Sequence, residues 1–183
     1  MTDNELITFP SLIVLVGPPG SGKSTWARRN RRGVVHVSQD DLIDAITPGG
    51  FNHVYRPIYR QAEDAIARAA LHAGHTVIVD RTNRTRAHRE RWLSLAREES
   101  CPAIAIVMST SEELCRERNS HREGSRRVSD ERMERMFAAF EPVRPDEAFG
   151  AVHFDNGMGS GINLATILSV KENVPHEYCH QAR

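Results

Sequence analysis

Residues 17–24 have the composition and spacing of a loop that binds phosphate groups. They read Gly-Pro-Pro-Gly-Ser-Gly-Lys-Ser and fit the pattern G-x-x-x-x-G-K-S/T at every fixed position. In such loops glycines let the backbone wrap around phosphate oxygens, the lysine reaches the β- and γ-phosphates, and the final hydroxyl is a ligand for Mg²⁺. The pattern predicts a nucleoside triphosphate site with Lys23 on the phosphates, Ser24 on the metal, and further nucleotide contacts from Gly17, Pro18, Pro19, Gly20, Ser21, Gly22 and Thr25.

Carboxylates directly follow two other apolar segments. Asp40 and Asp41 come shortly after residues 34–37, and Asp80 follows residues 76–79. A hydroxyl that accepts a phosphoryl group needs a carboxylate within hydrogen-bond reach to take its proton, which is the role predicted for Asp40. A carboxylate that ends a buried strand is typical of the Walker B arrangement, which organises Mg²⁺. The alternative is that Ser38 and the two aspartates at 40–41 cap the next helix.

Arginines cluster in two segments although the net charge of the chain is zero. The clusters lie within residues 81–91 and 116–127, and only two of the cations in the chain are lysines. Guanidinium groups match phosphate geometry bidentately, so the clusters indicate a local phosphate-binding face, whereas the balanced charge argues against a dedicated nucleic-acid coat. The second cluster is predicted to form a cationic lid, about residues 116–129, that closes over the nucleotide. A solvated helical face is the alternative.

These residues are separated by alternating strand and helix signals. Apolar runs predict five short strands, at residues 12–16, 34–37, 76–79, 104–108 and 151–154. Helical spacing appears between them, and the T-x-x-E sequence at residues 110–113 predicts a helix capped by Thr110. We therefore expect an α/β fold of the P-loop NTPase and kinase type, in three layers with a five-stranded parallel sheet and a helical lid. Ligands of such sheets bind at the carboxyl ends of the strands.

Length and composition limit the remaining possibilities. The chain has 183 residues, of which 39% are hydrophobic, and we expect one domain over residues 1–183 with a C-terminal tail at about 172–183. No apolar run approaches the roughly 20 residues that a transmembrane helix needs, and the acidic first residues differ from a signal peptide. Three scattered cysteines are typical of reduced thiols, which predicts a cytoplasmic protein.

Four segments, in this order, resemble the kinase domain of phage-type polynucleotide 5′-hydroxyl kinases. They are residues 17–28, 40–41, 77–83 and 118–122, and the resemblance extends over about residues 10–142. It implies an enzyme that uses ATP and Mg²⁺ to phosphorylate the 5′-hydroxyl of a nucleic acid, located in the host cytoplasm if a phage encodes it. It also implies that Asp40 is the general base and that the donor phosphates are contacted by Arg118 and Arg122, the latter counted as catalytic together with Lys23.

One position departs from the pattern of that family. Three positions after the first aspartate, where the family has an arginine that grips the 3′-phosphate of the acceptor, this chain has Ile43. The family's aspartate at the position of Asp80 orients that arginine, so Asp80 is counted with the acceptor site. Either Arg56, Arg81 or Arg84 grips the acceptor instead, or the acceptor is not a nucleic-acid 5′ end. The open alternatives are a kinase of hydroxymethyl pyrimidines in DNA, a kinase of a small hydroxylated metabolite or sugar nucleotide, and a nucleotide-gated switch, with ATP or GTP as the nucleotide.

Overall fold

The computed structural model describes residues 10–157 and 163–169. The predicted tail at 172–183 lies outside these residues. Within the described part, no helix combines the length and the apolar character needed to cross a membrane.

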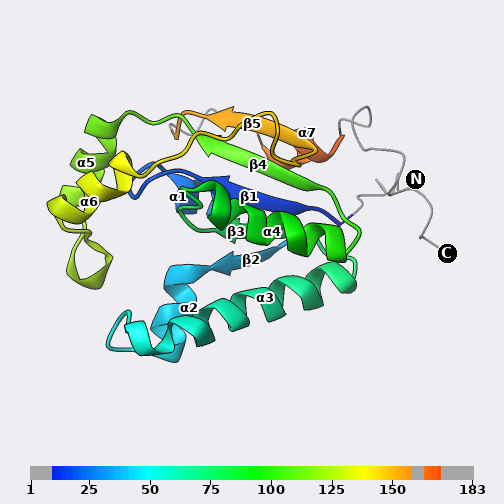
Figure 1. Ribbon diagram of the computed structural model, residues 1–183, viewed down its shortest axis with the longest axis horizontal. Coiled ribbons are helices and arrows are strands. Elements are labelled where there is room, and N and C mark those ends of the chain that lie inside the picture. Colours follow the sequence, from blue (N-terminus) through cyan, green and yellow to red (C-terminus); the bar gives the residue numbers. More distant parts are fainter. Residues whose placement is uncertain (1–9, 158–162, 170–183) are drawn as a thin grey trace.

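A sheet of five parallel strands forms the centre of the fold (Figure 1). The strands are β1 (Leu12–Val16), β2 (Val35–Ser38), β3 (Val77–Asp80), β4 (Ala103–Met108) and β5 (Ala151–Asp155). Their order is β2-β3-β1-β4-β5, so β1 lies in the middle with its carboxyl end between those of β3 and β4. This is the sheet of the P-loop kinase fold, and the prediction of a five-stranded parallel sheet is confirmed.

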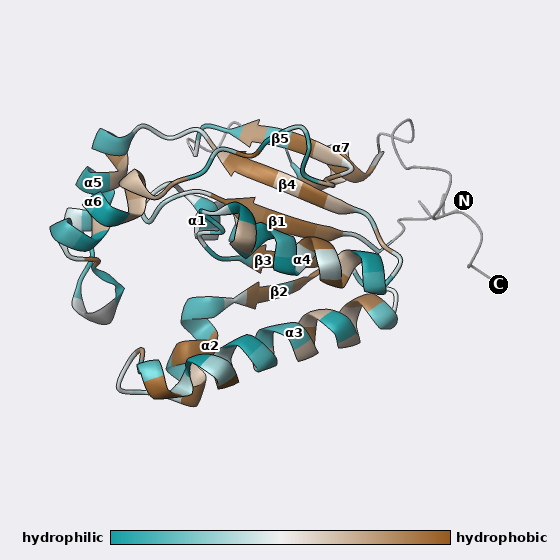
Figure 2. Ribbon diagram, in the orientation of Figure 1, coloured by the Kyte–Doolittle hydropathy of each residue, from teal (hydrophilic) through white to brown (hydrophobic). Residues whose placement is uncertain are grey.

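Helices cover both faces of the sheet and make it the middle of three layers. On one face pack α3 (Arg56–His72) and α4 (Arg86–Glu98), and on the other α1 (Lys23–Asn30) and α7 (Leu164–Ser169). Successive side chains of a strand point to opposite faces, so β1 divides its residues between the two cores. Because both faces are covered, the central strands are apolar along their length, as the brown strands between two-toned helices show in Figure 2.

Three helices lie at the carboxyl edge of the sheet: α2 (Gln39–Ile46), α5 (Glu112–Ser120) and α6 (Asp130–Ala138) (Figure 1). Two 3₁₀ turns, His53–Tyr55 and Gly124–Arg126, precede α3 and α6. The first residues of the predicted lid form the last turns of α5, and the rest of the lid contains the second 3₁₀ turn. An i,i+4 ion pair between Glu112 and Arg116 favours the continued helix.

The start of α5 differs from the predicted capping box. The N-cap is Ser111, whose Oγ accepts a hydrogen bond from the backbone N–H of Leu114 at 3.3 Å. Thr110 instead donates its hydroxyl to the carbonyl oxygen of Ser21, at 2.8 Å. The threonine thus joins the end of β4 to the phosphate loop, a long-range contact that outweighs the local capping pattern.

A buried arginine on α4 holds together two segments that are distant in sequence. Arg89 is fully buried, and its Nε and Nη2 donate to the two carboxylate oxygens of Glu147 at 2.6 and 2.7 Å. Its guanidinium also donates to the backbone carbonyls of Asn83 and Glu141. This bidentate pairing compensates the buried charge, and it fixes the chain that returns from α6 to the turn that follows β3.

Candidate active site

The phosphate loop, Gly17–Ser24, connects β1 to α1 and is closely packed on two sides. Gly20 and Gly22 have φ values of 82° and 100°, in the left-handed region that favours glycine. A Cβ at Gly20 would overlap the backbone carbonyl oxygen of Cys115 on α5, and one at Gly22 would lie 3.1 Å from the Cα of Gly157. Glycine at these positions lets the loop backbone pack closely and still curve around phosphate groups at the N-terminus of α1, where the helix dipole favours anions.

Gly20→Ala should lower the free energy of unfolding by roughly 2–4 kcal/mol, because it adds a steric overlap to a left-handed backbone. Gly33→Ala is the matched control. Gly33 has a φ of 74°, but a Cβ there would meet nothing within 4 Å, so only the backbone cost of about 1–2 kcal/mol is expected. Urea denaturation of both variants measures the difference. Equal losses would mean that α5 does not pack against the loop as described.

Lys23 and Ser24 lie at the centre of the site. The Nζ of Lys23 donates to the carbonyl oxygen of Pro18 at 2.7 Å and to the Oγ of Ser21 at 3.3 Å. Burial lowers the pKa of Lys23 to about 8, although the nearby Asp80 carboxylate opposes the shift. The Ser24 hydroxyl donates to the Asp80 carboxylate. Hydroxyl and carboxylate oxygens are the ligands that Mg²⁺ prefers, so Ser24 and Asp80 fit a magnesium ion.

Asp80 ends β3 with a charged side chain in a nearly buried position. Burial by itself would raise the pKa of this carboxyl. Hydrogen bonds from His36 and Ser24, together with the positive charge of Lys23, outweigh burial and lower the pKa. The His36 Nε2 lies 3.3 Å from the Oδ2 of Asp80. The carboxylate is thus held ionised at the carboxyl end of the sheet.

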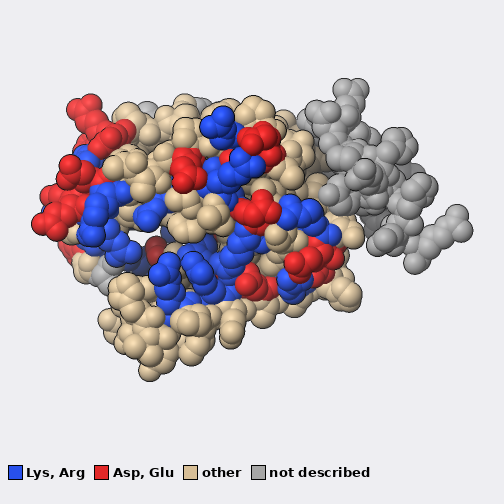
Figure 3. Space-filling model, in the orientation of Figure 1, with Lys and Arg blue, Asp and Glu red and all other residues tan. Residues whose placement is uncertain are grey.

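Asp40 lies beside this group, in the first turn of α2. The parallel register places Ser38, the N-cap of α2, opposite Asp80, and the Ser38 Oγ accepts the backbone N–H of Asp41 at 3.2 Å. Asp40 is exposed at the rim of the crevice, the hollow between the phosphate loop, α2 and the lid (Figure 3). Partial desolvation of its carboxyl nevertheless raises its pKa, and the negative charge of Asp80 adds to this effect. Asp41 is turned to the lid, 3.6 Å from the Nη2 of Arg126. Of the two aspartates, Asp40 is the one coupled to the phosphate loop.

The arginines of the predicted lid contact both sides of the crevice. Arg118 donates to the carbonyl oxygens of Gly20 and Gly157, each at 3.4 Å. Arg122 is near Lys23 and Asp40, and its charge affects the pKa of both. Arg126 pairs with Asp44 on α2 at 3.1 Å. The lid therefore bridges the phosphate loop and α2, and Figure 3 shows Lys and Arg side chains around a hollow on this face.

Of the three arginines considered for the acceptor, Arg81 and Arg84 have different surroundings. Arg81 is tied to the fully buried Glu63, with its Nη1 2.5 Å from the Oε2, and Arg91 shares the same oxygen at 3.0 Å. The charge of Arg81 is thus balanced within the fold. Arg84 has a buried Nε without a hydrogen-bond partner among the described residues. Ile43 is buried in the core, so no cation replaces the missing arginine at that position.

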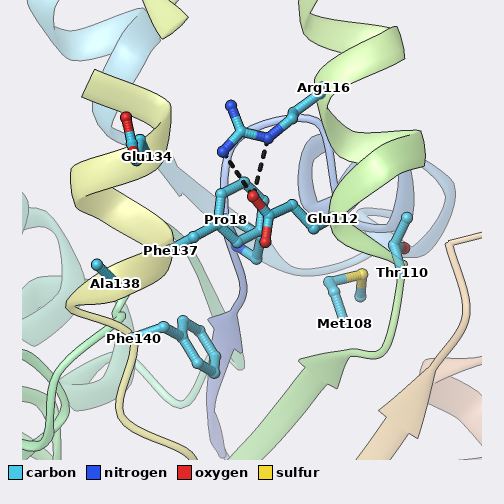
Figure 4. Close-up of a pocket in the computed structure, with 9 residues that line it drawn as sticks. All are labelled: Pro18, Met108, Thr110, Glu112, Arg116, Glu134, Phe137, Ala138 and Phe140. Atoms are coloured by element: carbon cyan, nitrogen blue, oxygen red, sulfur yellow. Dashed lines mark hydrogen bonds and ion pairs between the residues drawn. The ribbon is translucent and has the colours of Figure 1, made fainter. Parts of the chain in front are cut away.

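A second hollow lies between α5 and α6, next to Pro18 of the phosphate loop (Figure 4). It has a volume of about 630 Å³ and is lined by Pro18, Met108, Thr110, Glu112, Arg116, Glu134, Phe137, Ala138 and Phe140. Of the predicted nucleotide contacts, only Pro18 lines it. Phe137, whose helical spacing is typical of a core residue, is only half-buried and borders this hollow.

A family model described as an AAA domain, AAA_33, matches residues 12–143, which is most of the chain. The matched range contains the phosphate loop, Asp40, Asp80 and the lid. The chain belongs to the AAA_33 family.

Two curated relatives share sequence with this AAA domain. The bifunctional polynucleotide phosphatase/kinase of Schizosaccharomyces pombe is 33% identical over 113 residues, 61% of this chain and 24% of that protein. The shikimate kinase of Corynebacterium efficiens is 32% identical over 139 residues, 72% of each chain. Among solved structures, Kti12 of Chaetomium thermophilum in complex with ADP-AlF3 has a TM-score of 0.61 and 20% identity, over 79% of this chain and 88% of that chain.

The AAA domain spans about a quarter of the length of the polynucleotide phosphatase/kinase that it matches. The relatives include kinases that differ in their acceptor. The chain thus has the fold and the phosphate loop of the P-loop kinases, a class that uses ATP with Mg²⁺.

Proposed function

We propose that this kinase transfers the γ-phosphate of ATP to the 5′-hydroxyl of a polynucleotide. The observation that carries the proposal is the position of Asp40. Its carboxylate lies near Lys23 and Asp80: its charge raises the pKa of Lys23, and the charge of Asp80 adds to burial in raising the pKa of Asp40 itself. The side chain is also exposed to an incoming acceptor. A carboxylate in that position can take the proton of a hydroxyl as the hydroxyl attacks the γ-phosphorus.

The other residues take roles that suit this transfer. Gly17–Thr25 cradles the phosphates and Lys23 neutralises their charge. Ser24 and Asp80 would hold Mg²⁺, which when bound supplies positive charge to the β- and γ-phosphates. Arg118 and Arg122 reach the donor phosphates from the lid, which excludes water when it closes.

The choice of acceptor is supported by the partial match to a polynucleotide phosphatase/kinase and by the arginines around the hollow in Figure 3. A second candidate is a small hydroxylated acceptor. It is favoured by the more complete match to a shikimate kinase and by Ile43, which removes the cation expected for a 3′-phosphate.

Radiolabelled ATP with a panel of acceptors tests the proposal. The panel contains a 5′-hydroxyl oligonucleotide, the same oligonucleotide with a 5′-phosphate, hydroxymethyluracil DNA, shikimate, a nucleoside mixture and no acceptor. Label in the 5′-hydroxyl oligonucleotide alone supports the proposal. Label in a small acceptor or in hydroxymethyluracil DNA would replace it, and phosphate release without any labelled acceptor would indicate a nucleotide-gated switch.

The pH profile should report the carboxyl of Asp40. The base must be ionised, so kcat/KM for the acceptor should fall as the pH drops through its raised pKa, above the usual range of an aspartate. The charge of Arg126 lowers that pKa, so Arg126→Ala should move the acid limb to higher pH. Arg97→Ala, which breaks an exposed pair with Glu90, is the control and should leave the limb in place. A shift of the limb to lower pH in Arg126→Ala would contradict the assignment.

A further inference from the structure

The connection between α2 and α3 exposes an unusual amount of apolar and aromatic surface. Its tip and the first turn of α3 present four large side chains with 39–77% of their area exposed: Phe51, Val54, Tyr55 and Ile58. Figure 2 shows hydrophobic segments at this end of the molecule, where α2 leads to α3. Monomeric proteins seldom leave a contiguous apolar patch uncovered unless it binds something.

The aromatic tip is held in place from below. The ring of Phe51 contacts the rings of His53 and Tyr59, with centroids 4.9 and 5.6 Å apart. Tyr59 is buried, and its hydroxyl lies 2.5 Å from the Oγ1 of Thr47 and accepts the backbone N–H of Asn52. The exposed face of Phe51 is therefore a pre-ordered surface, which lowers the entropic cost of binding a flat ring.

Arginines without acidic partners adjoin this surface. Arg56 and Arg60 lie one turn apart on the first turns of α3, both are exposed, and neither side chain has an ion pair among the described residues. Arg84 adds the buried, unpartnered Nε. The neighbouring carboxylates of Glu63 and Asp64 pair with Arg81 and Arg91, and not with Arg56 or Arg60.

These cations converge on one region although they come from two segments of the chain. Burial first, and then the charges of Arg81, Arg84, Arg60 and Arg56, lower the pKa of His88 on α4. Arg91 also donates to the carbonyl oxygen of Arg60 at 2.6 Å, which joins α4 to α3 at this point. Figure 3 shows the cationic side chains between the hollow and the uncharged surface of the α2–α3 tip.

We propose that Phe51, Tyr55, Arg56, Arg60 and Arg84 form a binding surface for the first nucleotides of a single-stranded nucleic acid acceptor. The arginines bind its phosphates and the aromatic rings stack on its bases, the combination typical of single-strand recognition. The inference rests on the proposed function, in which the acceptor is a polynucleotide. Helix α2 leads from Asp40, the proposed base, to this surface. The arginines that bind the acceptor phosphate would thus lie on α3 and in the turn after β3, and not on α2, where Ile43 is buried.

Steady-state kinetics with a 5′-hydroxyl single-stranded oligonucleotide test the surface in the full chain. Phe51→Ala should raise the oligonucleotide KM roughly 5- to 100-fold, the effect of losing one stacked base, with kcat within about twofold. Phe51→Trp retains a stacking ring and should restore KM, which separates stacking from a folding defect. Arg68→Ala is the control, because Arg68 pairs with Glu98 and Glu99 at the other end of α3.

Salt dependence separates phosphate binding from stacking. Each phosphate contact on a single strand contributes about 0.7 to the slope of log affinity against log salt concentration. Arg84→Ala and Arg60→Ala should each lower the slope of log KM by about that amount, whereas Phe51→Ala should leave the slope unchanged. Equal slopes in all variants would overturn the arginine assignment.

Fluorescence anisotropy with a labelled oligonucleotide measures oligonucleotide affinity without phosphorylation. It therefore tests this surface separately from the proposed function. If the wild-type protein labels oligonucleotides and KM is unchanged in Phe51→Ala, Arg84→Ala and Arg60→Ala, the inference is overturned and the proposed function stands. Oligonucleotide binding that weakens in Phe51→Ala and Arg84→Ala supports the surface even if another acceptor is phosphorylated. The proposed surface is overturned if the wild-type protein does not bind the oligonucleotide, or if it binds only anionic vesicles or another protein.

Discussion

Replacing Arg122 by alanine is expected to lower kcat on the order of 10³-fold or more, with little change in the KM of the acceptor. An arginine supplied from a lid to the transferring phosphoryl group stabilises charge that develops only in the transition state. Arg122 is placed for this role because its charge acts on both Lys23 and Asp40, on opposite sides of the crevice. Single-turnover kinetics with saturating ATP measure the chemical step directly.

Two further variants sharpen the result. Arg122→Lys retains the charge but not the planar fork, so its rate should fall between those of wild type and alanine. Arg132→Ala removes an exposed arginine from α6 and should leave kcat unchanged. If Arg122→Ala raises the acceptor KM at constant kcat, the side chain binds the acceptor and not the donor phosphate.

Asp40→Asn should reduce kcat by roughly 10²–10⁴-fold and leave ATP affinity nearly unchanged. The substitution conserves the size of the side chain and removes its negative charge and its ability to accept a proton. Rates should be compared with nucleotide affinity from equilibrium binding, so that loss of chemistry is separated from loss of binding.

Asp41→Asn is the matched control for this change. Asp41 occupies the same helical turn but faces Arg126, so its loss should cost less than tenfold through a weaker contact with the lid. A severe defect in Asp41→Asn beside a mild one in Asp40→Asn would show that the wrong carboxylate has been assigned as the base.

The strands were predictable because each is marked by a contiguous apolar run in the sequence. A parallel strand covered on both faces must be apolar along its length, so the runs at 12–16 and 104–108 mark β1 and β4 without reference to the rest of the chain. The phosphate loop was equally visible, since its glycines and lysine are adjacent in sequence. The fold class and the loop together indicated a P-loop kinase, and the matching family model then showed the AAA_33 family.

The partners of charged residues were not predictable, because they depend on contacts between distant segments. Glu63 has the spacing of an ordinary helical residue, yet it is fully buried and balances Arg81, a candidate for the acceptor site. Thr110 fits a local capping pattern but bonds to Ser21 across the fold. Arg126 looked like one charge among many in the lid, and only the fold brings it to Asp44.

The strand order separates the residues proposed for the phosphate donor from those proposed for the acceptor, in two halves of the sheet. Under the proposed assignments, β1 and β4 with the lid carry the donor chemistry, while β2, β3 and the helices that follow them carry everything that meets the acceptor. The two halves are joined by the pairing of β1 with β3, and within the site they meet where Asp80 and Ser24 touch. Acceptor range is thus a modular property of this fold. An exchange of the segment from α2 to the end of α3 should redirect the enzyme to a new alcohol while its ATP half stays intact.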